Sequence, residues 1–145
     1  MTRIAPLAGV AANLERAFDS LPVPGVVSSY LFGSHAEGRA HRESDVDVGI
    51  LLHHGRYPTR RDRFEARLRL SGLLGGIVPG STVDVVILND APPQLARRIV
   101  TRGRRVFCAD AATDHAFVRD VQLRAADIEP FLRRTRRLKL AALAR

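Results

Sequence analysis

The sequence predicts a single domain of the α+β class, with a small mixed sheet flanked by helices and further helices at the C-terminus. At 145 residues, the chain has the commonest length of one domain. Its 46% hydrophobic and 26% charged residues are typical of a globular protein. Three short apolar runs have strand character, and segments with helical periodicity precede, separate and follow them. We therefore expect one unit over 1–145, with an α/β core over 1–112 and a helical segment over 113–145.

The first element is predicted to be an amphipathic helix, because Leu7, Val10, Leu14 and Phe18 recur at helical spacing before Pro22 ends the pattern. Strands are expected over 26–32, 46–52 and 83–88. The first is rich in β-branched and aromatic residues. The other two are almost continuous apolar runs, as in a sheet that is covered on both faces.

The remaining elements are predicted from caps and breakers. Thr59 is suited to cap a helix that runs to Leu74, where Gly75 and Gly76 stop it. Another helix should begin at Pro92-Pro93 and end at Gly103, before a short edge strand over 104–108. From Thr113 the pattern is helical again, and Pro130 is expected to separate two helices.

Composition restricts the class of protein and its partners. With 23 basic and 15 acidic residues, the net charge of +8 favours anionic partners, although an arginine-rich composition can also reflect genomic bias. A single cysteine, Cys108, excludes an intramolecular disulfide. No stretch approaches the roughly 20 apolar residues that a membrane span needs, so we expect no membrane association and a cytoplasmic location.

Three aspartates are the strongest candidates for chemistry. Asp45 and Asp47 flank the start of the second strand at i and i+2, so their side chains point to one face, roughly 7 Å apart. Asp84 opens the third strand in a similar way. If these strands are neighbours, the three carboxylates converge, and such a group suits two Mg²⁺ ions in a phosphoryl displacement. An isolated pair of this kind is more often solvated or part of a turn.

A phosphate cradle is expected beside the carboxylates. Gly33 and Ser34 directly follow the first strand, where backbone N–H groups and a hydroxyl can face a triphosphate. A Walker loop is excluded because no Gly-Lys-Ser/Thr sequence is present.

The order Gly33-Ser34, ten residues, Asp45-Val46-Asp47 and a later Asp84 resembles the signature of the polymerase-β-like nucleotidyltransferase superfamily. Within it, the small size and the segment VDVVILNDAPPQLARRIVTRGRRVF resemble the minimal nucleotidyltransferases (MNT), the antitoxins of HEPN/MNT toxin–antitoxin pairs. The resemblance implies that all three aspartates bind metal and act in catalysis, and that Gly33 and Ser34 bind the nucleotide. It further implies Mg²⁺-dependent transfer of AMP from ATP to tyrosine hydroxyls of a partner HEPN ribonuclease toxin, with release of pyrophosphate.

The sequence departs from the family at one position. Relatives commonly have Ala-Arg-Gly after the Gly-Ser-x, whereas Ala36-Glu37-Gly38 stands here, and Arg39 is near enough to substitute for the missing arginine. This departure motivates an alternative, a non-catalytic antitoxin that neutralises the toxin by binding alone. A third possibility, transfer to a small hydroxylated antibiotic, lacks support because the chain has little room for a second substrate domain.

The remaining histidines and basic segments are weaker candidate sites. Histidines 35, 41, 53 and 54 fit no zinc spacing, and solvated loop positions are favoured. The arginines of the helix over 60–74 are interspersed with acids, which favours a solvated face over a site for nucleic acid or for a partner, and direct nucleic-acid binding is not expected. The basic tail from Arg133 onward could close over the nucleotide, contact the toxin or touch RNA, and the toxin ranks first.

Overall fold

A computed structural model describes residues 7–34, 36, 45–77 and 81–144 of the chain. The strands are β1 (Val26–Phe32), β2 (Val46–Leu52), β3 (Val83–Ile87) and β4 (Arg104–Cys108), and they form a sheet in the order β3-β2-β1-β4. β1 is antiparallel to both of its neighbours, whereas β2 and β3 are parallel. The α+β class and the mixed sheet are therefore confirmed.

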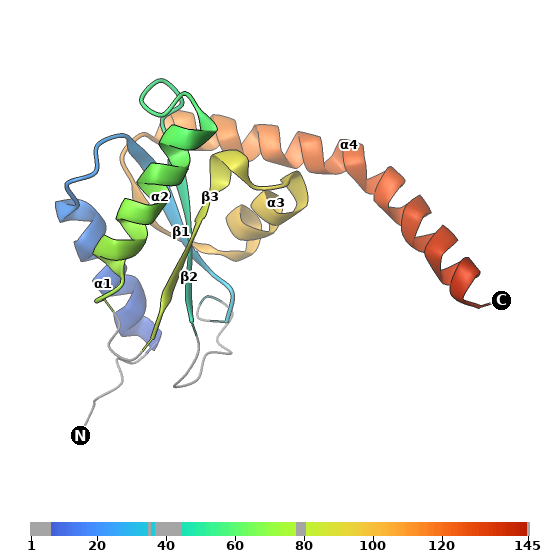
Figure 1. Cartoon of the computed structure of the whole chain (residues 1–145), viewed down its shortest axis with the longest axis horizontal. Helices are drawn as coiled ribbons and strands as arrows, with labels where there is room; N and C mark the ends of the chain where they lie inside the picture. Colours follow the sequence, from blue (N-terminus) through green and yellow to red (C-terminus); the bar gives the residue numbers. More distant parts are fainter. Residues whose placement is uncertain (1–6, 35, 37–44, 78–80, 145) are drawn as a thin grey trace.

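Helices cover both faces of this sheet. α1 (Leu7–Ser20) and α2 (Arg60–Leu74) lie on one side, and α3 (Pro93–Arg102) and the start of α4 (Ala111–Leu143) lie on the other (Figure 1). The larger core lies under α1 and α2, where Leu14, Leu70 and Leu74 are fully buried against the inward side chains of the strands.

The core beneath α3 is smaller and closely packed. It contains Val27, Tyr30, Leu51, Leu88 and Ile99. β2 has a glycine, Gly49, at the point where α3 approaches it. A Cβ at that position would come within 2.9 Å of Ile99 Cγ2, so a glycine here allows the helix to pack against the strand backbone.

Most predicted elements are confirmed. The first two strands have the predicted bounds, and the third ends one residue early because Leu88 enters a 3₁₀ turn, Leu88–Asp90. Thr59 caps α2 in a reciprocal capping box with Asp62. The segment over 104–108 is an edge strand paired only with β1.

The prediction of two C-terminal helices is wrong, since α4 is one helix with Pro130 inside it. A proline removes one backbone hydrogen bond and bends a helix, but the surrounding bonds remain. The flanking residues are mostly strong helix formers, which favours continuation of the helix beyond the bend. Consequently the distal half of α4 projects away from the body of the molecule (Figure 1).

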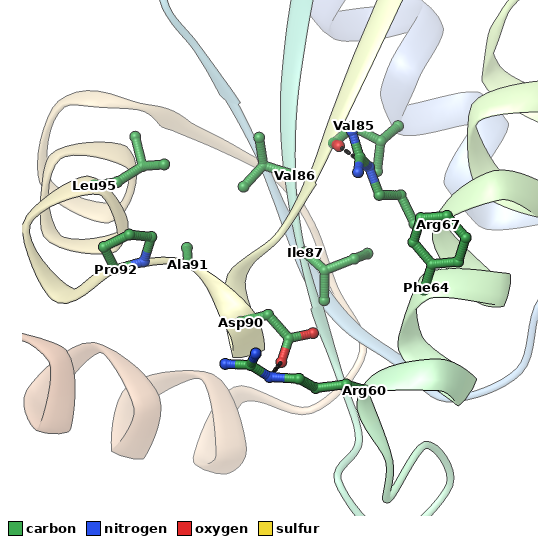
Figure 2. A pocket seen from close by; sticks show the side chains of 10 residues that line it. All are labelled: Arg60, Phe64, Arg67, Val85, Val86, Ile87, Asp90, Ala91, Pro92 and Leu95. Carbon is green, nitrogen blue, oxygen red and sulfur yellow. Dashed lines mark hydrogen bonds and ion pairs between the residues drawn. The ribbon is translucent and has the colours of Figure 1, made fainter.

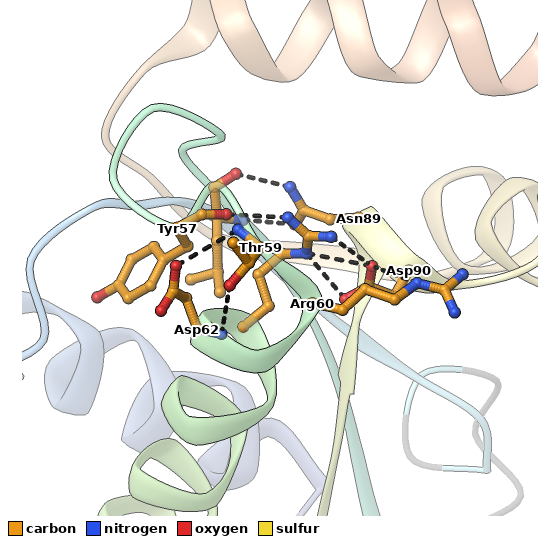
Figure 3. Close-up of polar contacts among 8 residues, drawn as sticks. Tyr57, Thr59, Arg60, Asp62, Asn89 and Asp90 are labelled. Carbon is orange, nitrogen blue, oxygen red and sulfur yellow. Dashed lines mark hydrogen bonds and ion pairs between the residues drawn. The ribbon is translucent and has the colours of Figure 1, made fainter.

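A polar network joins the ends of β2 and β3 to α2 (Figure 3). Arg63 is 8% exposed; its guanidinium donates through Nε and Nη2 to the Asp90 carboxylate and through Nη1 to the Tyr57 carbonyl. The side chain of Asn89 both accepts from the backbone N–H of Leu52 and donates to its carbonyl. These contacts fix the end of the sheet opposite the aspartates.

In the part of the chain that the structure describes, no helix is both long enough and apolar enough to cross a membrane.

Candidate active site

Two of the predicted carboxylates are brought together by strand register. Asp47 and Asp84 are paired residues of the parallel strands β2 and β3, so their Cα atoms are separated by the strand spacing of about 4.8 Å. Both point away from the core under α1 and α2, because their neighbours Val46, Val48 and Val85 are buried in it. The face with α3 therefore has two carboxylates side by side.

Asp45 directly precedes β2 and is exposed. Its Oδ1 accepts a hydrogen bond from the Thr82 hydroxyl, which lies two residues before Asp84. Asp45 thus lies at the same end of the sheet as the other two aspartates. The hydrogen bond joins the two segments that lead into the parallel strands β2 and β3.

Gly33 forms the third side of the site. β1 pairs with β2 so that Phe32 is opposite Asp47, and Gly33 follows with φ +74°, a conformation that favours glycine. A Cβ at Gly33 would overlap Asp47 Oδ2. The absence of a side chain at Gly33 therefore leaves room for the Asp47 carboxylate, and Ser34 follows in a partly exposed turn.

The site favours a hard cation by its chemistry. Neighbouring carboxylates repel each other, and no hydrogen bond or ion pair joins the Asp84 carboxylate to another residue in the described ranges. Carboxylate oxygens are the ligands that Mg²⁺ prefers. Among the described residues, no three His, Cys, Asp or Glu side chains are close enough to form a finished metal cage. The structure therefore does not place Asp45, Asp47 and Asp84 as one set of ligands around a metal ion, and their role as metal ligands stays a prediction.

A hollow adjoins this group on the side of α3. It has a volume of about 220 Å³ and is lined by Phe32, Gly33, Leu95, Arg98 and Arg102. Sequence reasoning did not single out the two arginines. The sequence signal that could have identified them is their i, i+4 spacing on the helix that follows the strand of Asp84 after a short 3₁₀ turn.

A longer groove of about 430 Å³ follows the free edge of β3 (Figure 2). Phe64 and Arg67 of α2 form one wall, and Pro92 and Leu95 form the other. Arg67 Nε donates a hydrogen bond to the backbone carbonyl of Val85, and this satisfies one of the backbone groups that an edge strand leaves without a strand partner. Its lining reaches Val85, the residue after Asp84, and includes none of the three aspartates.

A buried carboxylate, Asp114, was also missed from the sequence. It is 1% exposed and accepts hydrogen bonds from Ser28 Oγ (2.6 Å), Tyr30 Oη (2.7 Å) and Arg105 Nη1 (3.0 Å). Burial and the bond to Asp114 raise the pKa of the Tyr30 hydroxyl well above its ordinary value. The network joins α4 to β1 and β4. The sequence signal for it was an aspartate three residues before Phe117, on the otherwise apolar stripe of this helix.

Some predicted positions lie outside the described residues, namely His35, Glu37, Arg39 and His41. Of the other histidines, His53 Nε2 lies 3.3 Å from the Asp110 carboxylate, close to the start of α4. In the described ranges no cluster of ligands suited to zinc is formed.

The fold and the carboxylate arrangement together define a nucleotidyltransferase domain. Residues 15–112 match the family model for "Polymerase beta, Nucleotidyltransferase", which covers more than half of the chain. The chain belongs to this family.

Similar proteins were found among curated sequences and solved structures. The protein adenylyltransferase MntA of Shewanella oneidensis is 32% identical over 87 residues, which span 59% of this chain and 56% of that relative. The chain therefore covers only about half of the length of this relative. A chain of a toxin–antitoxin crystal structure with AMP-PNP superposes with a TM-score of 0.61 at 23% identity, covering 93% of this chain and 98% of that one. A chain of the complex between a tri-AMPylated Shewanella oneidensis HEPN toxin and an MNT antitoxin superposes with a TM-score of 0.57 at 21% identity, covering 94% of this chain and 99% of that one. These structural similarities establish the fold.

Proposed function

We propose that the protein is an antitoxin that transfers AMP from ATP to a tyrosine hydroxyl of a cognate HEPN ribonuclease toxin and releases pyrophosphate. The observation that carries the proposal is the pairing of Asp47 with Asp84 beside the side-chain-free position Gly33. The choice of AMP and of a toxin acceptor is supported by the relative named as a protein adenylyltransferase and by the complex with an AMPylated HEPN toxin.

In this proposal Asp45, Asp47 and Asp84 would hold two Mg²⁺ ions, and Gly33 and Ser34 would bind the triphosphate. The ions would neutralise charge on the phosphate oxygens in the transition state. The acceptor oxygen attacks the α-phosphorus, a new P–O bond forms, and the bond from the α-phosphorus to the bridging oxygen breaks. Pyrophosphate is thereby released. Asp84, which has no other partner among the described residues, accepts the proton of the attacking hydroxyl.

The acceptor must reach the α-phosphorus from solvent and in line with the leaving group. The groove along β3 supports such an approach because its lining reaches Val85, the residue after Asp84, and has a partly apolar wall, with Phe64 53% exposed. A partner protein can therefore present a side chain here without rearrangement of the core. We place the reaction in the cytoplasm, where ATP is available.

The alternative proposal is an antitoxin that masks its toxin without catalysis, and Glu37 in place of the family arginine favours it. The double variant D45N/D47N separates the two proposals in cells that express the toxin. Loss of protection with the antitoxin–toxin complex still formed supports catalysis. Full protection by the variant supports masking.

A biochemical experiment complements the cellular one. The purified protein, Mg²⁺, labelled ATP and the product of the adjacent gene are incubated, and the neighbour protein is examined for label. Label on the neighbour with wild type but not with D45N/D47N is expected. Absence of label with a folded wild-type protein contradicts the adenylyltransferase proposal.

A further inference from the structure

We propose that Arg98 and Arg102 of α3 bind the β- and γ-phosphates of the nucleotide and then the pyrophosphate product. This inference rests on the proposed nucleotidyl transfer and identifies residues that would recognise the leaving group. The two arginines are one helical turn apart and line the same hollow as Phe32 and Gly33.

The position of α3 makes this hollow a defined site. Ala96 and Ile99 are buried on the inner side of the helix, and Ile99 is part of the smaller core. At its end, Gly103 lies so close to β1 that a Cβ there would come within 2.9 Å of the Leu31 carbonyl. Arg98 and Arg102 therefore project from a helix that is fixed on both its inner face and its last turn, next to the end of β1.

The two arginine side chains that line the hollow have no ion-pair partner among the described residues. Neither the Arg98 nor the Arg102 side chain forms an ion pair or a hydrogen bond with another described residue, whereas the neighbouring Arg97 pairs with Glu129 of α4 at 3.5 Å. Like charges at i and i+4 on a helix repel each other. A bound anion would relieve this repulsion.

The place and the shape of the donors favour phosphate as that anion. Gly33 lines the hollow and also contacts the carboxylate of Asp47, so an anion between Gly33 and the arginines would lie beside the proposed reaction centre. Guanidinium groups present paired N–H donors that match phosphate oxygens. The pair would also supply the positive charge that the family arginine, replaced by Glu37, does not provide in this chain.

The test is calorimetric titration of the full-length protein with three probes, ATP, AMP and inorganic pyrophosphate, each with Mg²⁺. For R98A/R102A we expect the affinity for ATP and pyrophosphate to fall roughly tenfold or more, as is typical when charge-assisted bonds are lost. The affinity for AMP should change little. R98K/R102K retains the charge but loses the paired donors, so its affinities for ATP and pyrophosphate should be intermediate.

R97A is the matched control, since it removes a cation from the same helix but outside this hollow, and it should bind ATP and pyrophosphate as wild type does. Equal binding of pyrophosphate by wild type and R98A/R102A would overturn the inference and leave the proposed function standing. An equal loss of AMP affinity would also overturn it, because the arginines would then not be specific to the outer phosphates. If folded wild-type protein binds neither ATP nor pyrophosphate, the proposed function fails as well.

Discussion

Gly33, the residue after β1, lies directly against the carboxylate of Asp47 in the adjacent antiparallel strand β2. Because Gly33 has a positive φ and no side chain, Asp47 can occupy the space beside the end of β1. The glycine of the phosphate cradle thus also determines where a proposed metal ligand can lie.

The first prediction concerns this contact. Gly33→Ala would place a methyl group in the space of the Asp47 carboxylate and strain the backbone by about 1–2 kcal/mol. We expect the rate of AMP transfer to fall on the order of a hundredfold, since small displacements of reacting groups have effects of that size. The measurement is transfer of label from ATP, together with thermal unfolding.

Gly72→Ala is the matched control, because a Cβ at Gly72 meets nothing within 4 Å. Gly72 is inside α2, where alanine is preferred, so this change should stabilise the protein by about 0.5–1 kcal/mol and leave the transfer rate unchanged. A Gly33→Ala variant with wild-type activity would show that the Asp47 carboxylate does not need this position.

The second prediction concerns the buried carboxylate of α4. Asp114→Ala would leave Ser28, Tyr30 and Arg105 without their shared acceptor in a largely buried environment. We expect the free energy of unfolding to fall by about 3–5 kcal/mol. Urea denaturation measures this change.

The control for that change is Asp120→Ala, which breaks the exposed pair with Arg124 on the same helix. Its expected cost is at most about 1 kcal/mol. If Asp114→Ala and Asp120→Ala had equal effects, the network would not be what fastens α4 to the sheet.

The third prediction concerns pH and the cap of α4. The Asp110 carboxylate accepts from the hydroxyl and the backbone N–H of Thr113, and these bonds, with a smaller contribution from His53, hold its pKa below its ordinary value of 3.8. The contribution of this carboxylate to stability is therefore complete above pH 3.8 and is lost as the pH falls through the lower pKa of the folded state.

Asp110→Asn keeps a capping side chain that does not titrate. The stability difference between wild type and Asp110→Asn should therefore shrink as the pH is lowered from about 5 to about 3, measured by urea denaturation at each pH. A difference that stays constant over this range would contradict the assignment of the pKa shift to the folded cap.

The fourth prediction concerns the distal half of α4. Removal of residues 133–145 deletes a projecting basic segment with exposed Leu138, Leu140 and Leu143 but leaves the contacts of Asp114 in place. We expect unchanged binding of ATP and weakened binding of the toxin, measured by calorimetry with each ligand. Unchanged toxin binding would show that the tail is not a toxin contact.

Local patterns predicted most of the fold. The strands over 26–32 and 46–52, the Thr59 cap and the Gly103 stop depend on neighbouring residues, and such signals are visible in a single sequence. Pro130 misled the prediction because a proline weakens only one turn, and whether the helix continues depends on the residues around it. The division at residue 112 stays a prediction, and α4 begins at Ala111.

The candidate site was predictable only in part. The motif identified Gly33, Asp47 and Asp84, and their proximity required that β2 lie between β1 and β3 in the sheet. Arg98 and Arg102 could not be assigned, because their relation to Gly33 depends on how α3 returns across the sheet. For the same reason the partners of Asp114 had no local signal, because Tyr30 and Ser28 precede it in the chain by 84 and 86 positions.

The central claim is that the three aspartates catalyse AMP transfer to a partner protein. The most direct measurement compares ATP labelled at the α-phosphate with ATP labelled at the γ-phosphate, each incubated with Mg²⁺, the protein and the purified product of the adjacent gene. We predict that the neighbour protein retains the α label and not the γ label, and that D45N/D47N abolishes the transfer. Retention of the γ label, or equal α labelling by D45N/D47N, would contradict it.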